Sequence, residues 1–165
     1  MNNVSGRALR YGDNVNTDVI IPAKYLNTTD IATLAEHAME PLDPEFRRKV
    51  STCNILVVGR NFGCGSSREH AAIVLKAAGI RAILAESYAR IFFRNAINQG
   101  IPAFEIRGLS SDVDQGDLLE LDLNSWKLRN LTKAITIELS RLPDFLMDIL
   151  ASGGLVNYLK KRRTW

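Results

Sequence analysis

The stretch that decides the fold is residues 54–106, which opens with Asn54-Ile55-Leu56-Val57-Val58-Gly59. This opening segment is short, apolar and rich in β-branched residues, so it predicts a buried strand. The pattern then alternates between helical and extended segments, at residues 66–78, 80–86, 87–99 and 101–106. Such alternation predicts parallel strands joined by right-handed crossover helices.

The segments on either side of this stretch have different patterns. Before it, we expect extended pieces at 7–11 and 15–21 and helices at 30–39 and from Asp43 onward. After it, we expect antiparallel strands at 117–123 and 134–139 and helices at 143–151 and 155–160. Together they predict one mixed α/β domain over residues 1–165, with a mostly parallel central sheet, a smaller antiparallel sheet and flanking helices.

The charge distribution argues against a nucleic-acid partner. The net charge is +3 over 165 residues, and four positive charges lie in the run 160–163, which leaves the body close to neutral. We interpret this run as a solvated end, because a nucleic-acid binder usually carries a basic stripe across its folded body.

The hydrophobic pattern predicts neither secretion nor a membrane span. No apolar run approaches the roughly 20 residues that cross a bilayer, and the N-terminus lacks the pattern of a secretory signal. The expected location is therefore the cytoplasm.

The chain has two cysteines, Cys53 and Cys64, which form neither a disulfide framework nor a CxxC pair. A cubane iron–sulfur cluster normally needs four thiolates, and three if one iron is left open. We therefore expect no metal site in this chain, and any cluster used in catalysis must be held by another chain.

The chemically informative segment is residues 61–70, Asn-Phe-Gly-Cys-Gly-Ser-Ser-Arg-Glu-His, between a predicted strand and a predicted helix. Loops at the carboxyl ends of parallel strands are where open α/β sheets bind ligands, and helix N-termini there favour anions. A glycine turn followed by a Ser66/Glu69 capping box would account for the pattern without any function. Arg68 favours a functional interpretation, because an arginine in a first helical turn opposes the helix dipole unless it meets an acidic partner or a carboxylate ligand.

Three familiar motifs do not fit this segment. A P-loop needs lysine after its last glycine, where Ser66 stands. The dinucleotide fingerprint and the nucleophile elbow both need a small residue or glycine where Arg68 stands.

Residues 65–72 (Gly-Ser-Ser-Arg-Glu-His-Ala-Ala), 16–20 (Asn-Thr-Asp-Val-Ile) and 87–91 (Ser-Tyr-Ala-Arg-Ile) resemble the swivelling domain of the aconitase family. The resemblance is greatest to the free-standing small subunits of the family's isopropylmalate dehydratases. It covers nearly the whole chain, in the family's order, and it implies the swivelling β/β/α fold.

The resemblance also implies a mechanism split between two chains. A [4Fe-4S] cluster on a large subunit acts as Lewis acid on a hydroxy dicarboxylate, while the small subunit supplies the serine that removes a proton. The matching serine is Ser66. Substrate-binding residues implied by the match are Ser67, Arg68 and Asp18, with Gly65 bringing the backbone close to the ligand. Glu69 and His70 are expected to be structural, with Glu69 capping the helix and His70 bonded within the fold. Cys64 is expected to be a small loop residue beside the site and not a ligand.

Substrate choice in the family is linked to the loop that here reads Tyr25-Leu26-Asn27-Thr28. Relatives acting on tricarboxylates have an arginine in this loop, whereas Asn27 has no charge to balance an additional carboxylate. A dicarboxylate with an apolar side group is therefore expected, although Lys24 nearby could supply a charge. The resemblance favours dehydration and rehydration of isopropylmalate in leucine biosynthesis.

Two alternatives remain open at this point. One is a related hydro-lyase acting on homoaconitate, citramalate or dimethylmalate. The other is a non-catalytic module that binds carboxylates through the same glycine loop.

Overall fold

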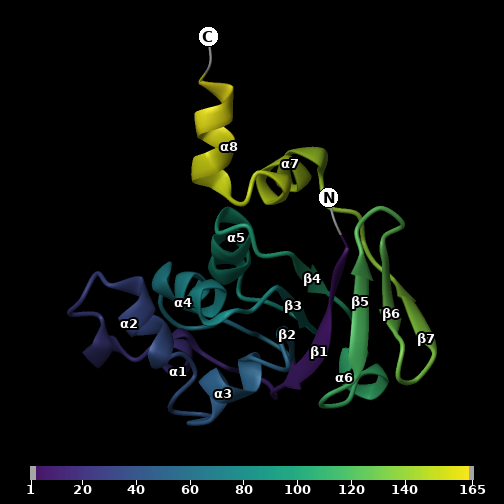
Figure 1. Cartoon of the computed structure of the whole chain (residues 1–165), viewed down its shortest axis with the longest axis horizontal. Helices are drawn as coiled ribbons and strands as arrows, with labels where there is room; N and C mark the ends of the chain where they lie inside the picture. The colour runs from purple at the N-terminus through teal and green to yellow at the C-terminus, as the bar shows by residue number, and fades with distance from the viewer. Residues whose placement is uncertain (1–2, 164–165) are drawn as a thin grey trace.

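The structure, a computed structural model of the chain, describes residues 3–163. Its elements, shown in Figure 1, follow in the order β1 (Val4–Arg10), α1 (Thr17–Ile20), the 3₁₀ helix η1 (Ala23–Tyr25), α2 (Ile31–Glu36), α3 (Phe46–Val50), β2 (Ile55–Val58), α4 (His70–Ala78), β3 (Ala82–Ala85), α5 (Arg90–Asn98), β4 (Ala103–Glu105), α6 (Leu109–Asp112), β5 (Leu118–Asp122), β6 (Lys127–Asn130), β7 (Ile135–Glu138), α7 (Asp144–Ala151) and α8 (Leu155–Arg162).

Within the described residues the strands form one sheet in the order β4-β3-β2-β1-β5-β6-β7. The pairs β1–β2, β2–β3 and β3–β4 are parallel. The pairs β1–β5, β5–β6 and β6–β7 are antiparallel. β1 belongs to both halves, because residues 8–10 pair with β2 and residues 4–7 pair with β5. The predicted parallel and antiparallel sheets are thus both present, and they are joined through β1.

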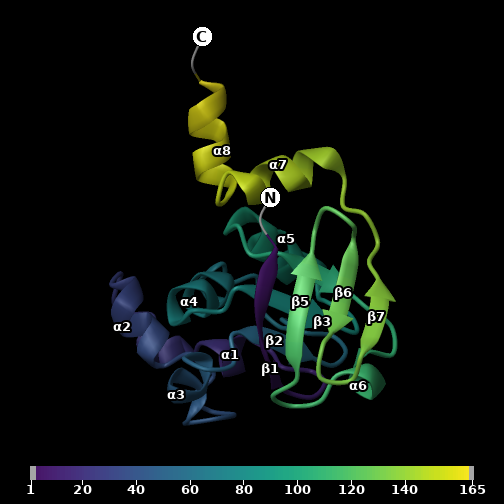
Figure 2. The ribbon, with the colours of Figure 1, turned by 45° about the vertical axis from the view of Figure 1, so that its right-hand side comes forward.

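The parallel half is buried on both faces, which accounts for its continuous apolar runs. Leu56 and Val58 pack in a core with the helices, whereas the alternate residues Ile55 and Val57 pack in a second core with β5 and β6. In Figures 1 and 2, helices α1–α4 and strands β5–β7 lie on opposite sides of β1. The chain therefore has the three layers expected of the β/β/α fold.

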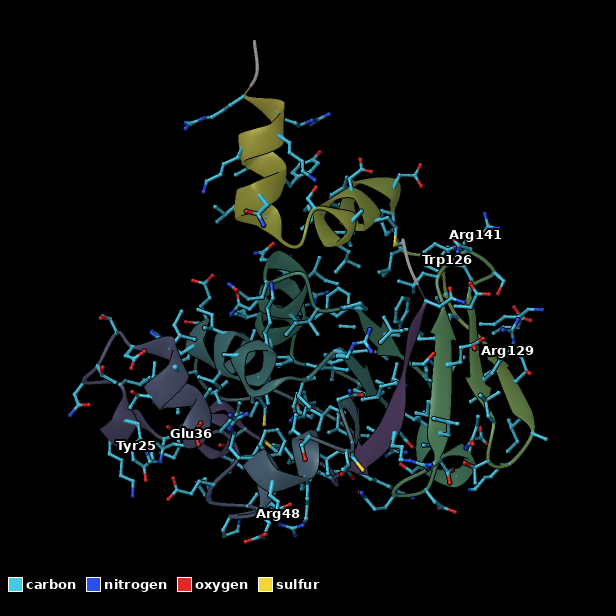
Figure 3. The ribbon with its side chains drawn as sticks, viewed as in Figure 1. Tyr25, Glu36, Arg48, Trp126, Arg129 and Arg141 are labelled. Carbon is cyan, nitrogen blue, oxygen red and sulfur yellow. The ribbon has the colours of Figure 1, made fainter. Side chains whose placement is uncertain are left out.

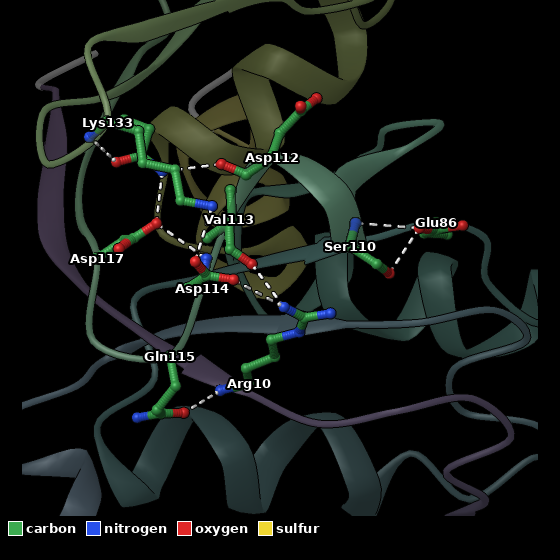
Figure 4. A network of polar contacts seen from close by, with 10 residues as sticks. Arg10, Glu86, Ser110, Asp112, Val113, Asp114, Gln115, Asp117 and Lys133 are labelled. Atoms are coloured by element: carbon green, nitrogen blue, oxygen red, sulfur yellow. Dashed lines mark hydrogen bonds and ion pairs between the residues drawn. The ribbon is translucent and has the colours of Figure 1, made fainter.

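A polar network holds the segment around α6 against the antiparallel half (Figure 4). The buried Asn130 side chain donates to the Asp112 carbonyl at 2.9 Å and to the Asp117 carboxylate at 2.6 Å. Arg10 donates to the Val113 carbonyl at 3.0 Å from the end of β1. These bonds connect β1, α6 and β6 through groups that would be costly to leave unpaired.

The predicted extended piece at 15–21 is wrong, since α1 occupies most of it. Asn16 is the reason, because its side chain accepts a hydrogen bond from the Val19 amide at 2.9 Å and caps a helical turn. The apolar residues Val15, Ile20 and Ile21 are buried by this turn. Their spacing in the sequence fits a strand as well as it fits the turn.

The helix predicted from residue 66 begins only at His70, and the capping box is also wrong. Glu69 accepts a hydrogen bond from the Gln99 side chain at 3.0 Å and does not cap the helix. The helix does end at Gly79, which has a φ of +112°, as predicted. Residues 66–69 therefore remain a loop at the carboxyl end of the parallel half.

The sequence pattern predicts neither β6 nor α6, because polar residues dominate both segments. α7 and α8 form as predicted, and α8 buries none of its residues (Figures 1 and 2). Within residues 3–163, no helix is both long and apolar enough to cross a membrane.

Candidate functional site

The loop from Asn61 to Arg68 follows β2 and is fixed to the neighbouring strand connections. The Asn61 amide donates to the Ser87 hydroxyl at 2.8 Å, and the Phe62 amide donates to the Ser87 carbonyl at 3.1 Å. Gly63 has a φ of +78°, and a Cβ there would lie 2.1 Å from the Phe92 ring. Glycine is therefore required where the loop crosses α5.

Residues 87–91 hold this loop in place through hydrogen bonds and ring packing. The Tyr88 hydroxyl donates to the Ile83 carbonyl at 2.7 Å, and its ring packs edge-on against Phe62. Burial raises the pKa of Tyr88 well above its usual value, so the hydroxyl stays protonated and continues to donate. Ser87 and Tyr88 were predicted only as part of a family motif, and the structure gives them a supporting role.

The beginning of α1 lies directly against the glycine loop. The Thr17 amide donates to the Cys64 carbonyl at 2.9 Å, and Asn16 and Cys64 form a short parallel bridge. Gly65 has a φ of +101°, and a Cβ there would lie 3.2 Å from the Thr17 hydroxyl. The two motifs at 16–20 and 65–72 thus form one site.

Ser66 is exposed and bonded to a buried threonine. The hydroxyl oxygens of Ser66 and Thr17 are 3.1 Å apart, and the Ser66 amide donates to the Thr17 hydroxyl oxygen at 3.2 Å. Thr17 is only 2% exposed, so its side chain holds one position. When Thr17 donates its proton toward Ser66, it stabilises negative charge on the Ser66 oxygen. The sequence motif alone gives Thr17 no role of its own.

Arg68 lies beside Ser66 in the loop and is oriented from α1. One guanidinium nitrogen, Nη1, contacts the Asp18 carboxylate at 2.5 Å and the Ile21 carbonyl at 3.2 Å. The other guanidinium N–H groups make no hydrogen bond within residues 3–163, and the side chain is partly exposed. The guanidinium therefore has donors available to a carboxylate beside Ser66.

Ser67 completes the exposed donors of the loop. In the described part of the chain, neither its amide nor its hydroxyl makes a hydrogen bond, and the residue is exposed. The exposed Ser66 hydroxyl, the unpaired Ser67 amide and the oriented Arg68 form an arrangement able to hold a carboxylate and to exchange a proton with the carbon next to it.

Comparisons with known proteins identify the family of the chain. Residues 13–107 match the family described as the aconitase C-terminal domain. A 3-isopropylmalate dehydratase small subunit from Caldanaerobacter subterraneus is 50% identical over 96% of this chain and 99% of its own length. The corresponding protein of Pyrobaculum calidifontis is 55% identical over 96% of this chain and 98% of its own length.

The chain belongs to the 3-isopropylmalate dehydratase small subunits. A crystal structure of 3-isopropylmalate dehydratase from Methanocaldococcus jannaschii superimposes with a TM-score of 0.91 and 46% identity, over 98% of this chain and 95% of the other. The fold class predicted from the sequence is thereby confirmed. A curated relative from the same organism, 50% identical over 96% of this chain and 95% of its own length, is named an isopropylmalate/citramalate isomerase small subunit.

In this dehydratase small subunit, Asn27 makes no hydrogen bond to the residues around Ser66 within residues 3–163. It is exposed in the turn after η1. Tyr25, labelled in Figure 3, stabilises the turn by stacking on His37, with ring centroids 3.7 Å apart, and by donating to Glu40. The role of Asn27 in substrate choice therefore stays a prediction.

His70 begins α4 as an exposed residue whose side chain makes no hydrogen bond within residues 3–163, so the expectation that it is bonded within the fold is wrong. The cysteines Cys53 and Cys64 are both free. No group of three or more potential metal-ligating side chains occurs among the described residues. Two separate cysteines without further ligands nearby do not fit an iron–sulfur cluster.

Proposed function

We propose that this chain is the small subunit of a hydro-lyase that interconverts 2-isopropylmalate and 3-isopropylmalate in leucine biosynthesis. The names of its relatives support the substrate, and the site supports the chemistry. The observation that carries the proposal is the exposed Ser66 hydroxyl, 3.1 Å from the Thr17 hydroxyl and two residues from the oriented Arg68. A large subunit is its proposed partner, and the cytoplasm stays the expected location.

Ser66 is the proposed catalytic base. In dehydration, its alkoxide takes a proton from the carbon next to a substrate carboxylate, the C–H electrons form the alkene, and the C–O bond breaks with loss of hydroxide. In rehydration, Ser66 returns a proton to carbon while hydroxide adds to the neighbouring carbon. Serine is a weak base, so the Thr17 hydroxyl supports this role by donating to the alkoxide.

Arg68 and Ser67 are the proposed carboxylate-binding residues. Asp18 and the Ile21 carbonyl hold one side of the guanidinium, which leaves its other N–H groups for the substrate. Asp18 acts through Arg68 in this arrangement, and Gly65 keeps the backbone close to Thr17. Fixing the carboxylate next to Ser66 aligns the acidic C–H bond with the base.

The family's [4Fe-4S] cluster is proposed to belong to the large subunit, since the described residues of this chain offer no ligand set for it. When bound there, the cluster supplies a Lewis acid for the substrate hydroxyl. The residues of this chain hold the carboxylate and the proton.

Citramalate is a second candidate substrate, because the Methanocaldococcus jannaschii relative carries both substrates in its name. Citramalate is a dicarboxylate with a smaller apolar group, so the same Arg68 and Ser66 arrangement would serve it. Homoaconitate is less favoured, because Asn27 carries no charge for its third carboxylate.

The proposal is tested by following alkene absorbance anaerobically with 2-isopropylmalate. Three samples are compared: this chain alone, a cluster-loaded large subunit alone, and the two mixed. We expect turnover only in the mixture. A mixture that turns over citramalate but not 2-isopropylmalate would select the second candidate, and one that turns over neither would contradict the proposed activity.

A further inference from the structure

A cavity of about 740 Å³ lies between the two edges of the sheet. β4 and the residues after it form one wall, α5 forms another, and β7 with residues 140–142 forms the third. Its volume lies in the range typical of small-molecule sites. None of residues 61–68 lines it, so it is separate from the Ser66 loop.

The cavity has an apolar floor and a basic rim. Five large apolar side chains contribute to the floor: Phe93, Phe104, Ile106, Ile137 and Leu142. Three arginines line the rim, namely Arg90, Arg94 and Arg107. Arg141 follows the lining residue Ser140 in the sequence, but it is exposed and does not itself line the cavity.

These four arginines differ from the other basic residues of the body. Within residues 3–154, every other lysine or arginine makes a hydrogen bond, an ion pair or a contact with an aromatic ring. Within the part of the chain that the structure describes, Arg90, Arg94, Arg107 and Arg141 make none. Three of the four unpaired arginines, Arg90, Arg94 and Arg107, thus line one cavity.

Two of these arginines occupy positions that are locally unfavourable. Arg90 is the first residue of α5, where a positive charge opposes the helix dipole, and the helix has no side-chain cap. Arg94 is four residues further along, so the two like charges share one face of the helix. The acidic lining residues Glu105 and Glu138 form no ion pair with them within residues 3–163. An anion in the cavity would offset both the unfavourable interaction of Arg90 with the helix dipole and the repulsion between Arg90 and Arg94.

We propose that this cavity binds a small organic anion with an apolar body. The arginine rim supplies charge-assisted hydrogen bonds to a carboxylate or a similar group, and the aromatic and aliphatic floor covers the rest of the molecule. A free inorganic anion would leave the floor exposed, and a neutral apolar molecule would leave the arginines unpaired. The site needs neither the large subunit nor the proton chemistry of Ser66.

The test uses the isolated chain, with hexanoate as the probe, hexanamide as its neutral analogue and acetate as an anion without an apolar body. Titration calorimetry gives the dissociation constant, and amide chemical shifts of the labelled chain locate the site. We expect hexanoate to bind about tenfold or more tightly than either analogue, with shifts at residues 90–94 and 104–107. Arg94→Gln with Arg107→Gln should weaken hexanoate by about tenfold or more.

A matched control replaces Arg48 and Arg162 by glutamine, which removes the same charge away from the cavity. The control should change the hexanoate dissociation constant by less than about twofold, since distant surface charges are screened. Equal binding of hexanoate and hexanamide, shifts centred on Ser66, or no effect of the cavity variant would each overturn the proposal. So would a cavity variant that only weakens assembly with the large subunit, because the basic rim would then be a protein contact. Turnover by the mixed subunits is measured separately, so failure of this site leaves the proposed activity untouched.

Discussion

The two halves of the sheet bury their side chains differently. The parallel half carries the candidate site, whereas the antiparallel half stabilises the fold. Every residue of β2 and β3 is buried, whereas β5 and β6 alternate between buried and partly exposed residues. The carboxyl edge of the parallel half gathers the loops that carry Ser66, Arg68 and Ser87. The antiparallel half carries the buried Asn130 network. Changes at the parallel edge should therefore affect turnover, and changes in the antiparallel half should affect stability.

After the loss of Ser66 itself, the largest expected effect is that of Arg68→Gln on turnover. The variant loses the charged hydrogen bonds to the substrate carboxylate and leaves Asp18 without its partner. We expect kcat/KM of the assembled enzyme to fall about a hundredfold, since each charged bond contributes roughly 1.5–3 kcal/mol. Steady-state kinetics with the large subunit measures it.

Arg81→Gln is the matched control, because Arg81 is an arginine at the amino end of β3 that donates to the Ser5 carbonyl. It should keep kcat/KM within about twofold, as expected for a partly solvated bond away from the site. Equal losses for the Arg68 and Arg81 variants would contradict the assignment of Arg68 to the carboxylate.

The second effect concerns the antiparallel half. Asn130→Ala removes donors and acceptors that are buried with Asp117 and the Asp112 carbonyl. The free energy of unfolding should fall by about 2 kcal/mol, because buried partners are left unpaired. Urea unfolding measures the loss. The kcat of the assembled enzyme should be unchanged. A large drop in kcat without a loss of stability would contradict the claim that the antiparallel half affects stability and not turnover.

A smaller effect is expected for Thr17→Val, which keeps the shape of the side chain but removes its hydroxyl. Ser66 then loses the neighbour that stabilises its alkoxide, and kcat should fall about tenfold. Thr17→Ser restores the hydroxyl and should recover most of the rate. If valine and serine are equally slow, the role of Thr17 is packing and not support of Ser66.

The smallest effect is a pH dependence of stability at Asp43. Burial raises the pKa of this carboxyl, but hydrogen bonds from Lys49, Tyr11 and the Glu45 amide outweigh burial and leave the pKa below its usual value of 3.8. Asp43 therefore contributes stability above pH 3.8, and this is lost as the pH falls through the lower folded-state pKa. Asp43→Asn should make the free energy of unfolding less dependent on pH below about 4. If the pH dependence of the free energy of unfolding is unchanged in the variant, the ion pair between Asp43 and Lys49 does not contribute as proposed.

The parallel half was predictable from the sequence, because a continuous apolar run such as 55–58, followed by a helix that ends at a glycine, is compatible with few structures. The antiparallel half was predictable only in part. Leu128 is the one fully buried apolar residue of the polar segment β6, so no clear alternation is visible there. The turn at 16–20 differs from its predicted extended form, because the cap supplied by Asn16 outweighs the β-branched residues that follow.

The candidate site was predictable as a motif but not as a geometry. Ser66, Ser67, Arg68 and Asp18 were implied by the resemblance to the aconitase family, and the structure places Asp18 against Arg68. The contact between Thr17 and Ser66 spans 49 residues of sequence and depends on how α1 meets the glycine loop. The cavity with unpaired arginines depends on the curl of the whole sheet, which no local pattern encodes.

The measurement that tests the central claim most directly is kcat for Ser66→Ala, assembled with a cluster-loaded large subunit and supplied with 2-isopropylmalate. We predict that the variant assembles like the wild type and loses about a hundredfold to ten-thousandfold in kcat, as expected when a proton-transferring group is removed. Turnover close to that of the wild type by the assembled variant would contradict the claim that this chain supplies the base.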